Sequence, residues 1–244
     1  MADIVALRRR PAGGGDGGGI AALVRSQGLA GLVRPASAYV PQPDGVAERI
    51  LPVLPELRGL FPAGGLRRGS TVAVTTTSVL LALLAATSTG GSWCAVVGMP
   101  ALGLAAAVEL GVALDRLALV PDPGLEWPAV VAALLDGVDL VAVAPSGPVS
   151  AAVASRLVAR ARQRGGVLLP YGPWPGADVV LETAGGGWEG LDRGRGRLSR
   201  RRLVISRRGR GAAAQPRQAT MWIPRPAELP EPGLARPRVL EAAG

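Results

Sequence analysis

The chain has 244 residues, of which 48% are apolar and 3% aromatic, which suits one α/β domain with a core of small aliphatic side chains. Its formal net charge is +9, and all 27 basic residues are arginine, because the chain contains no lysine; it contains no histidine either. These absences exclude Ser-His-Asp catalysis, histidine-ligated metal sites and lysine Schiff bases. The single cysteine, Cys94, cannot form an internal disulfide and indicates a reduced, cytoplasmic setting.

The two ends of the chain have compositions typical of poorly ordered segments. Residues 1–47 include a glycine-rich run over 13–19, and we expect a disordered or partly helical N-terminal arm and linker. Residues 224–244 are proline-rich and predict a loosely ordered tail. No apolar stretch stands where a signal peptide would, and the apolar run over 72–86 is too short to span a bilayer. We therefore expect a soluble cytoplasmic protein without a membrane partner.

Between these ends, apolar strands alternate with helices. The expected strands are Thr71–Val74, Ser92–Val97, Leu117–Val120, Leu140–Ala144 and Val167–Leu169, and the expected helices are Val79–Ser88, Ala101–Leu110, Glu126–Asp136 and Val149–Arg164. Continuously apolar strands of this kind are typical of a parallel sheet covered on both faces. The sequence thus predicts an α/β core over residues 48–185, with a mostly parallel central sheet and helices on both faces.

After Tyr171 the pattern changes to shorter strands. These are expected at Asp178–Thr183, Trp188–Leu191, Arg202–Ser206 and Ala219–Ile223, joined by glycine-rich turns. We expect them to form a C-terminal antiparallel extension on the sheet edge, with residues 186–223 making a basic β extension.

The segment from Leu66 to Ser78 has the frame of a P-loop, in which a strand enters a tight loop and a helix follows. A P-loop holds phosphate with glycine backbone N–H groups, a lysine, and a Ser or Thr that binds magnesium. Here the loop reads Thr75-Thr76-Thr77-Ser78, has neither glycine nor lysine, and is too short to wrap a triphosphate. We interpret it as a degenerate nucleotide loop. Its hydroxyls either cap the helix through Thr77 or Ser78, or form a residual anion site at the helix start.

The two acidic positions of a P-loop ATPase are vacant as well. The strand that would carry the magnesium-binding acid ends in Ala144-Pro145, and Asp139 lies at its other end, where capping or solvent exposure is expected. The segment after the strand over 92–97 begins at Gly98 and has no acid to position water. The chain is therefore expected not to be an enzyme and to need neither cofactor nor metal.

Three stretches resemble the core of RecA in their order and spacing. They are residues 66–74 with the leucine-rich helix over 79–84, residues 92–97 with Ala101-Leu102, and residues 110–117, which read Leu-Gly-Val-Ala-Leu-Asp-Arg-Leu. Within that superfamily the chain is most similar to the ImuA-type proteins of the ImuA′ branch. The similarity to that branch is carried by residues 54–66, which read Leu-Pro-Glu-Leu-Arg-Gly-Leu-Phe-Pro-Ala-Gly-Gly-Leu, together with residues 93–98 and 188–191.

This resemblance covers residues 48–185 and implies a RecA-like core. It implies an accessory role in the SOS response to DNA damage, in which the protein would serve mutagenic translesion synthesis. The partners it implies are an ImuB-like protein and an error-prone C-family DNA polymerase, with the complex at the nucleoid when engaged. It supplies no catalytic residues, because none match. The related SulA proteins imply a further alternative, inhibition of cell division.

Residues 193–217 carry a concentration of arginine that no acidic residue interrupts. Its members are Arg193, Arg195, Arg197, Arg200, Arg201, Arg202, Arg207, Arg208, Arg210 and Arg217. Clustered guanidinium groups suit phosphate contacts, so this segment predicts a direct DNA-binding module as the alternative function. Two other interpretations stay open: docking of an acidic partner protein, and an edge strand that its charge protects from aggregation.

Overall fold

The computed structural model describes residues 49–192 and 195–223. The strands are β1 (Ile50–Leu51), β2 (Leu66–Arg67), β3 (Val72–Val74), β4 (Cys94–Val97), β5 (Leu117–Val120), β6 (Leu140–Val143), β7 (Val167–Pro170), β8 (Val179–Asp192), β9 (Arg195–Gly209) and β10 (Arg217–Ile223). The α-helices are α2 (Thr77–Thr89), α3 (Leu104–Glu109), α4 (Trp127–Leu134) and α5 (Ala151–Arg164). Short 3-10 helices are η4 (Pro55–Leu60), η5 (Leu114–Arg116), η6 (Gly124–Glu126) and η7 (Gly211–Ala213).

The main sheet is built from two groups of four strands that lie side by side. One group has the order β5-β4-β6-β7 and the other the order β3-β8-β9-β10. Parallel bridges between Thr71 and Leu168 and between Val74 and Tyr171 join β3 to β7. The sheet is therefore parallel from β5 through β8, and β9 runs antiparallel to both of its neighbours.

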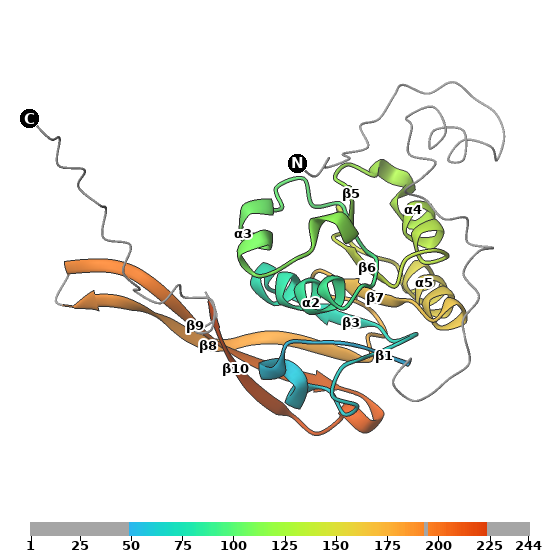
Figure 1. The fold of residues 1–244 in the computed structure, drawn as a ribbon. Coiled ribbons are helices and arrows are strands. Elements are labelled where there is room, and N and C mark those ends of the chain that lie inside the picture. The colour runs from blue at the N-terminus through green and yellow to red at the C-terminus, as the bar shows by residue number, and fades with distance from the viewer. Residues whose placement is uncertain (1–48, 193–194, 224–244) are drawn as a thin grey trace, which may run out of the picture.

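Helices cover both faces of the parallel part, as expected for an α/β fold. Figure 1 shows α2 and α3 on one side of the sheet and α4 and α5 on the other. Alternate residues of β3 point toward the two helix layers. Val72 and Val74 pack in the apolar cluster that contains α2, and Ala73 packs in the cluster that contains α5. Burial on both faces explains why these strands are apolar at every position. The prediction of an α/β fold is thus confirmed, and β5 has the predicted bounds.

Local capping residues set both ends of α5, whereas α2 is distinguished by its burial. The hydroxyl of Ser150 caps α5 by accepting from the Val153 amide at 3.3 Å, and Gly165, with φ of 70°, ends it in the left-handed region. Helix α2 is buried almost all round rather than amphipathic, because α3 and η4 belong to the same apolar cluster as the sheet face beneath it.

The C-terminal region forms an antiparallel extension, but its strands are longer than the sequence predicted. Strand β8 runs unbroken through Gly185–Gly187, which we had expected to be a turn. A register shift between Thr183 and Gly185 marks a β-bulge, and Gly186 has a φ of 151°. A Cβ on Gly186 would lie 2.2 Å from the Arg202 carbonyl oxygen. The glycines therefore let the strand bulge against β9 instead of ending it.

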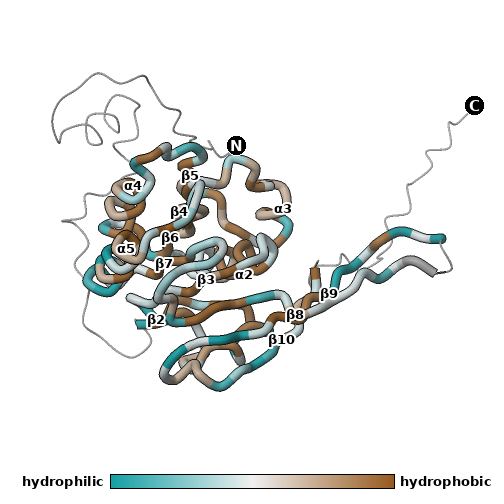
Figure 2. The backbone as a smooth tube through the Cα atoms, turned by 180° about the vertical axis from the view of Figure 1, so that it is seen from behind, coloured by the Kyte–Doolittle hydropathy of each residue, from teal (hydrophilic) through white to brown (hydrophobic). Residues whose placement is uncertain are grey.

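The predicted domain boundary at residues 185/186 falls inside β8, so the core and the basic extension share one strand. The predicted N-terminal arm (residues 1–47), the C-terminal tail (residues 224–244) and Arg193 lie outside the described residues. Hydrophobic residues concentrate in the strands and helices of the body, and the projecting part of β8 and β9 is largely hydrophilic or neutral (Figure 2).

Candidate functional site

The loop of residues 75–78, which the sequence predicts to be a degenerate nucleotide loop, lies where β3 meets α2. The predicted capping by Thr77 or Ser78 is wrong, because α2 begins at Thr77 with Thr76 as its N-cap and has no side-chain capping hydrogen bond. The hydroxyls of this loop bond elsewhere: Thr76 Oγ1 lies 2.7 Å from Thr183 Oγ1, and Thr77 Oγ1 lies 3.2 Å from the Tyr171 hydroxyl. These bonds tie the start of α2 to β8 and to the end of β7.

The carboxyl ends of the neighbouring parallel strands lie at the same edge of the sheet. Parallel α/β sheets place their sites outside the carboxyl ends of the strands, which here means beside Thr75, Gly98, Ala144 and Tyr171. Gly98 has a φ of 77°, and a Cβ there would lie 2.3 Å from the Ala144 carbonyl oxygen. The ends of β4 and β6 therefore approach closely enough to exclude any side chain at position 98.

Asp139 lies at the opposite end of β6 and stabilises the fold there. Its Oδ2 accepts a hydrogen bond from the Trp93 amide at 2.8 Å, and its Oδ1 pairs with Arg68 Nη1 at 2.8 Å. The neighbouring Cys94 is fully buried in β4, as expected for a core cysteine. Burial, and secondarily the Asp139 charge, raise the pKa of the Cys94 thiol to about 12. This thiol stays protonated near neutral pH and is a poor nucleophile.

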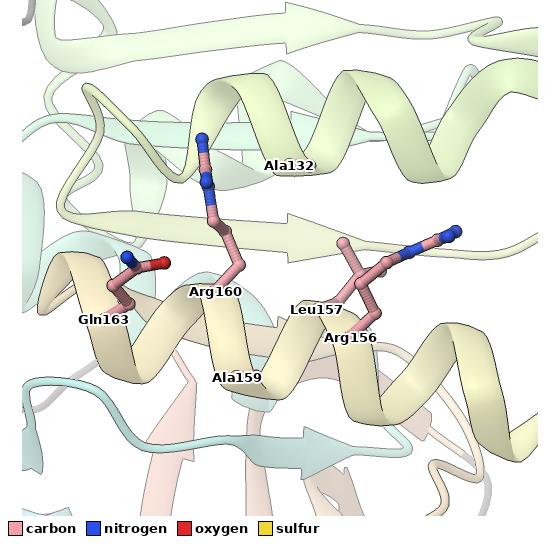
Figure 3. A pocket seen from close by; sticks show the side chains of 6 residues that line it. All are labelled: Ala132, Arg156, Leu157, Ala159, Arg160 and Gln163. Carbon is pink, nitrogen blue, oxygen red and sulfur yellow. The ribbon is translucent and has the colours of Figure 1, made fainter.

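A surface groove of about 490 Å³ separates α4 from α5 (Figure 3). Arg160 points from α5 toward α4 in Figure 3, where the Asp136 carboxylate binds its Nε at 2.7 Å. The same carboxylate accepts from Arg164 Nε at 3.1 Å, and its bond to Arg160 raises the pKa of that guanidinium. The Asp136 carboxylate is thus shared by two arginines of α5, and these ion pairs hold α5 to the end of α4. Of the two arginines on the groove wall, Arg160 forms an ion pair and Arg156 forms none within the described ranges.

Within residues 49–192 and 195–223, His, Cys, Asp and Glu side chains nowhere gather in threes close enough to hold a metal ion. In the same residues, the helices are all too short or too polar to cross a bilayer.

The arginines of the basic segment lie in different environments, some buried and some exposed. The prediction that Arg207 contacts DNA or a partner is wrong, because the residue is only 2% exposed. Its guanidinium donates to the Leu60 carbonyl at 2.9 Å and to the Gln215 carbonyl. It lies on the face of β9 that carries Leu203 and Ile205, which explains its burial. Arg210 uses its Nη2 to bond the Ala177 carbonyl at 3.0 Å.

Acidic residues that are distant in sequence lie beside other arginines. Arg200 pairs with Glu189 at 2.9 Å, and Arg208 lies 3.7 Å from Glu182, because β8 runs antiparallel beside β9. The segment has no internal acid, so only the strand pairing reveals these partners. Arg195, Arg197 and Arg202 are exposed.

Two tryptophans lie against this segment. The guanidinium of Arg201 lies 5.6 Å from the ring centre of Trp188, and that of Arg200 lies 5.1 Å from the ring centre of Trp222. Trp188 is 58% exposed and borders a hollow of about 190 Å³ that also includes Gly185–Gly187 and Arg201. The candidate site is therefore the exposed part of the β8–β9 hairpin.

The fold and these sites define an α/β protein with a projecting basic hairpin. Residues 59–176 match the family described as MT3502 N-terminal domain. The uncharacterized protein Rv3395c of Mycobacterium tuberculosis is 44% identical over 142 residues, which cover 54% of this chain and 70% of the relative. The chain belongs to the MT3502 N-terminal domain family. The family match ends before β8 begins, so the hairpin lies outside it.

Proposed function

We propose that this protein is a RecA-like accessory factor of mutagenic translesion synthesis that acts by protein contacts and does not hydrolyse ATP. The resemblance to ImuA-type proteins suggests the process and the partners, an ImuB-like protein and an error-prone C-family polymerase in the cytoplasm. The mostly parallel sheet, with helices on both faces and an antiparallel C-terminal extension, supports a RecA-like core.

One observation carries the non-catalytic part of the proposal. The strand–loop–helix segment over 66–78 has the order of a P-loop, but the loop hydroxyls bond to other residues of the protein. The hydroxyls of Thr76 and Thr77 bond to Thr183 and Tyr171, and Gly98 abuts the Ala144 carbonyl. The chain also has no lysine to reach a phosphate. A protein with this frame and without phosphate chemistry is best suited to a scaffolding role.

The test begins with a strain that lacks the gene for this protein. We expect the deletion to abolish damage-induced mutagenesis, and we expect the full-length chain to restore it and to co-purify with an ImuB-like protein encoded nearby. A double Thr76→Val, Thr77→Val variant, which removes both hydroxyls with little change of volume, should restore mutagenesis as well as the native chain does.

Two results would overturn the proposal. Normal induced mutagenesis in the deletion strain would remove the assigned process. Hydrolysis of ATP by the purified protein, lost in the double threonine variant, would make it an ATPase.

A further inference from the structure

The β8–β9 hairpin extends beyond the strands that flank it. Strand β3 pairs with β8 only over Val179–Leu181, and β10 pairs with β9 only over residues 201–207. We call residues 185–192 and 195–202 the arm. Figure 1 shows the arm running out past α2 and away from the body. A two-stranded ribbon buries little apolar surface and adds little to stability, so its length points to a contact outside the body.

The arm is cationic where it is exposed. Its described residues include five arginines and two carboxylates, Glu189 and Asp192. One of the five, Arg200, is neutralised by Glu189 at 2.9 Å. Arg195, Arg197 and Arg202 are exposed, and Arg201 lies over the ring of Trp188. Such a surface complements a polyanion.

The cations lie on both faces of the ribbon. Side chains of successive residues in a strand point to opposite faces, so Arg201 shares the face of the buried Leu203. Arg202 lies on the other face, opposite Trp222 of β10, and the guanidinium of Arg200 also reaches that ring. A partner docked on one face would contact only part of this charge. A ligand that surrounds the ribbon would contact all of it.

We propose that the arm inserts into a groove of duplex DNA. The major groove, about 12 Å wide, admits a two-stranded β-ribbon, and a phosphate backbone lines each wall of the groove. Arginine makes bidentate bonds to phosphate, and such contacts are independent of sequence. The glycines at 185–187 present bare main chain beside the hollow of about 190 Å³, where a sugar-phosphate strand can approach closely. This contact is separate from those with an ImuB-like protein and does not depend on them.

The first test compares two variants of the full chain that lose equal charge. The arm variant carries Arg195→Gln, Arg197→Gln, Arg201→Gln and Arg202→Gln. The matched body variant replaces four exposed arginines outside the arm, Arg49, Arg58, Arg67 and Arg156, with Gln. Binding to a fluorescent 25-base-pair duplex of arbitrary sequence is followed by anisotropy between 50 and 200 mM salt.

We expect the arm variant to bind on the order of 100-fold more weakly at 100 mM salt, with the slope of log affinity against log salt reduced by about 3. The body variant should stay within about threefold of the native chain. Equal losses in both variants, or no loss in the arm variant, would overturn the proposal. So would equal or tighter binding of the single strand, or equally strong competition by a polyglutamate peptide, which would assign the arm to an acidic protein.

A second test locates the DNA without removing any charge. Cys94 is buried, so a new surface cysteine is the thiol that a photoreactive maleimide labels. Leu198→Cys places the label on the arm, where the native residue is 46% exposed, and Leu125→Cys places it on the body at a residue that is 91% exposed. Crosslinking to the duplex from position 198 and not from position 125 is expected. Crosslinking from 125 alone, or equally from both, would overturn the proposal.

Discussion

Arg207 Nη1 donates a hydrogen bond to the carbonyl oxygen of Leu60 at 2.9 Å, across a separation of 147 residues. The bond joins β9 to the end of η4, and the guanidinium is buried among apolar side chains. A second bond from Nη2 reaches the Gln215 carbonyl before β10. The arginine therefore satisfies two carbonyls that the fold has taken out of water.

Replacing Arg207 with alanine should destabilise the protein by about 3 kcal/mol, because it leaves both carbonyls unpaired and opens a cavity. Arg208→Ala is the matched control, since that side chain is 75% exposed, and its effect should stay below about 0.5 kcal/mol. Urea unfolding followed by tryptophan fluorescence measures both. Equal midpoints for the two variants would contradict the structural role of Arg207.

A comparison of Gly98 with Gly91 separates the cost of a steric clash between the ends of β4 and β6 from the cost of backbone strain. Both have positive φ, 77° and 88°, so alanine at either position costs about 1–2 kcal/mol. A Cβ at position 91 would meet nothing within 4 Å, whereas one at 98 would meet the Ala144 carbonyl. Gly98→Ala should therefore cost about 2 kcal/mol more than Gly91→Ala in urea unfolding. Equal costs would mean that the two strand ends separate easily.

The pKa of Cys94 predicts how stability depends on pH. Because its folded pKa, about 12, exceeds its ordinary value of 9.0, the unfolded chain loses its thiol proton first as the pH rises. The folded state is then disfavoured above pH 9, and at pH 10 the loss is about 1.4 kcal/mol. Relative to a Cys94→Ala variant, which has no thiol, the native protein should lose this amount between pH 8 and pH 10. A difference between the two proteins that does not change with pH would contradict a raised pKa.

Asp139 stabilises the amino ends of β4 and β6, at the edge of the sheet opposite Gly98. Asp139→Ala removes the acceptor of the Trp93 amide and the partner of Arg68, and we expect a loss of about 2 kcal/mol. Asp115 serves as the control, because its carboxylate is exposed and lies 3.9 Å from Arg116, and Asp115→Ala should change stability by less than about 0.5 kcal/mol. Thermal unfolding of the two variants checks the difference, and similar melting temperatures would place Asp139 outside the stabilising network.

The α/β core could be predicted from the sequence because its signals are local. Strand β5 has the predicted bounds, and β6 ends one residue before its predicted end, at Val143. Apolar runs between helices indicate the strands of a parallel sheet. Residue type alone shows that the loop over 75–78 has neither glycine nor lysine, and its interpretation as a degenerate nucleotide loop remains a prediction. The resemblance to RecA and ImuA-type proteins remains a prediction.

The pairing across the sheet could not be predicted, because it depends on register. Gly185–Gly187 have the composition of a turn, yet the neighbouring β9 holds them in a strand. Glu182 and Glu189 are far from the arginines in sequence and reach them only in the antiparallel hairpin. The same alternation that exposes Arg202 buries Arg207, so a count of arginines did not distinguish a surface cation from a core one.

The arm has a further consequence for how the protein behaves in solution. Along its outer edges, in the described ranges, β8 beyond Leu181 and β9 before Arg201 have no neighbouring strand, so backbone N–H and C=O groups there can accept another chain. Mutual repulsion of the arginines keeps the arms of two molecules apart, and this repulsion reaches about 10 Å at 0.1 M salt but only about 3 Å at 1 M. We therefore expect the protein to self-associate more readily in concentrated salt than in dilute buffer.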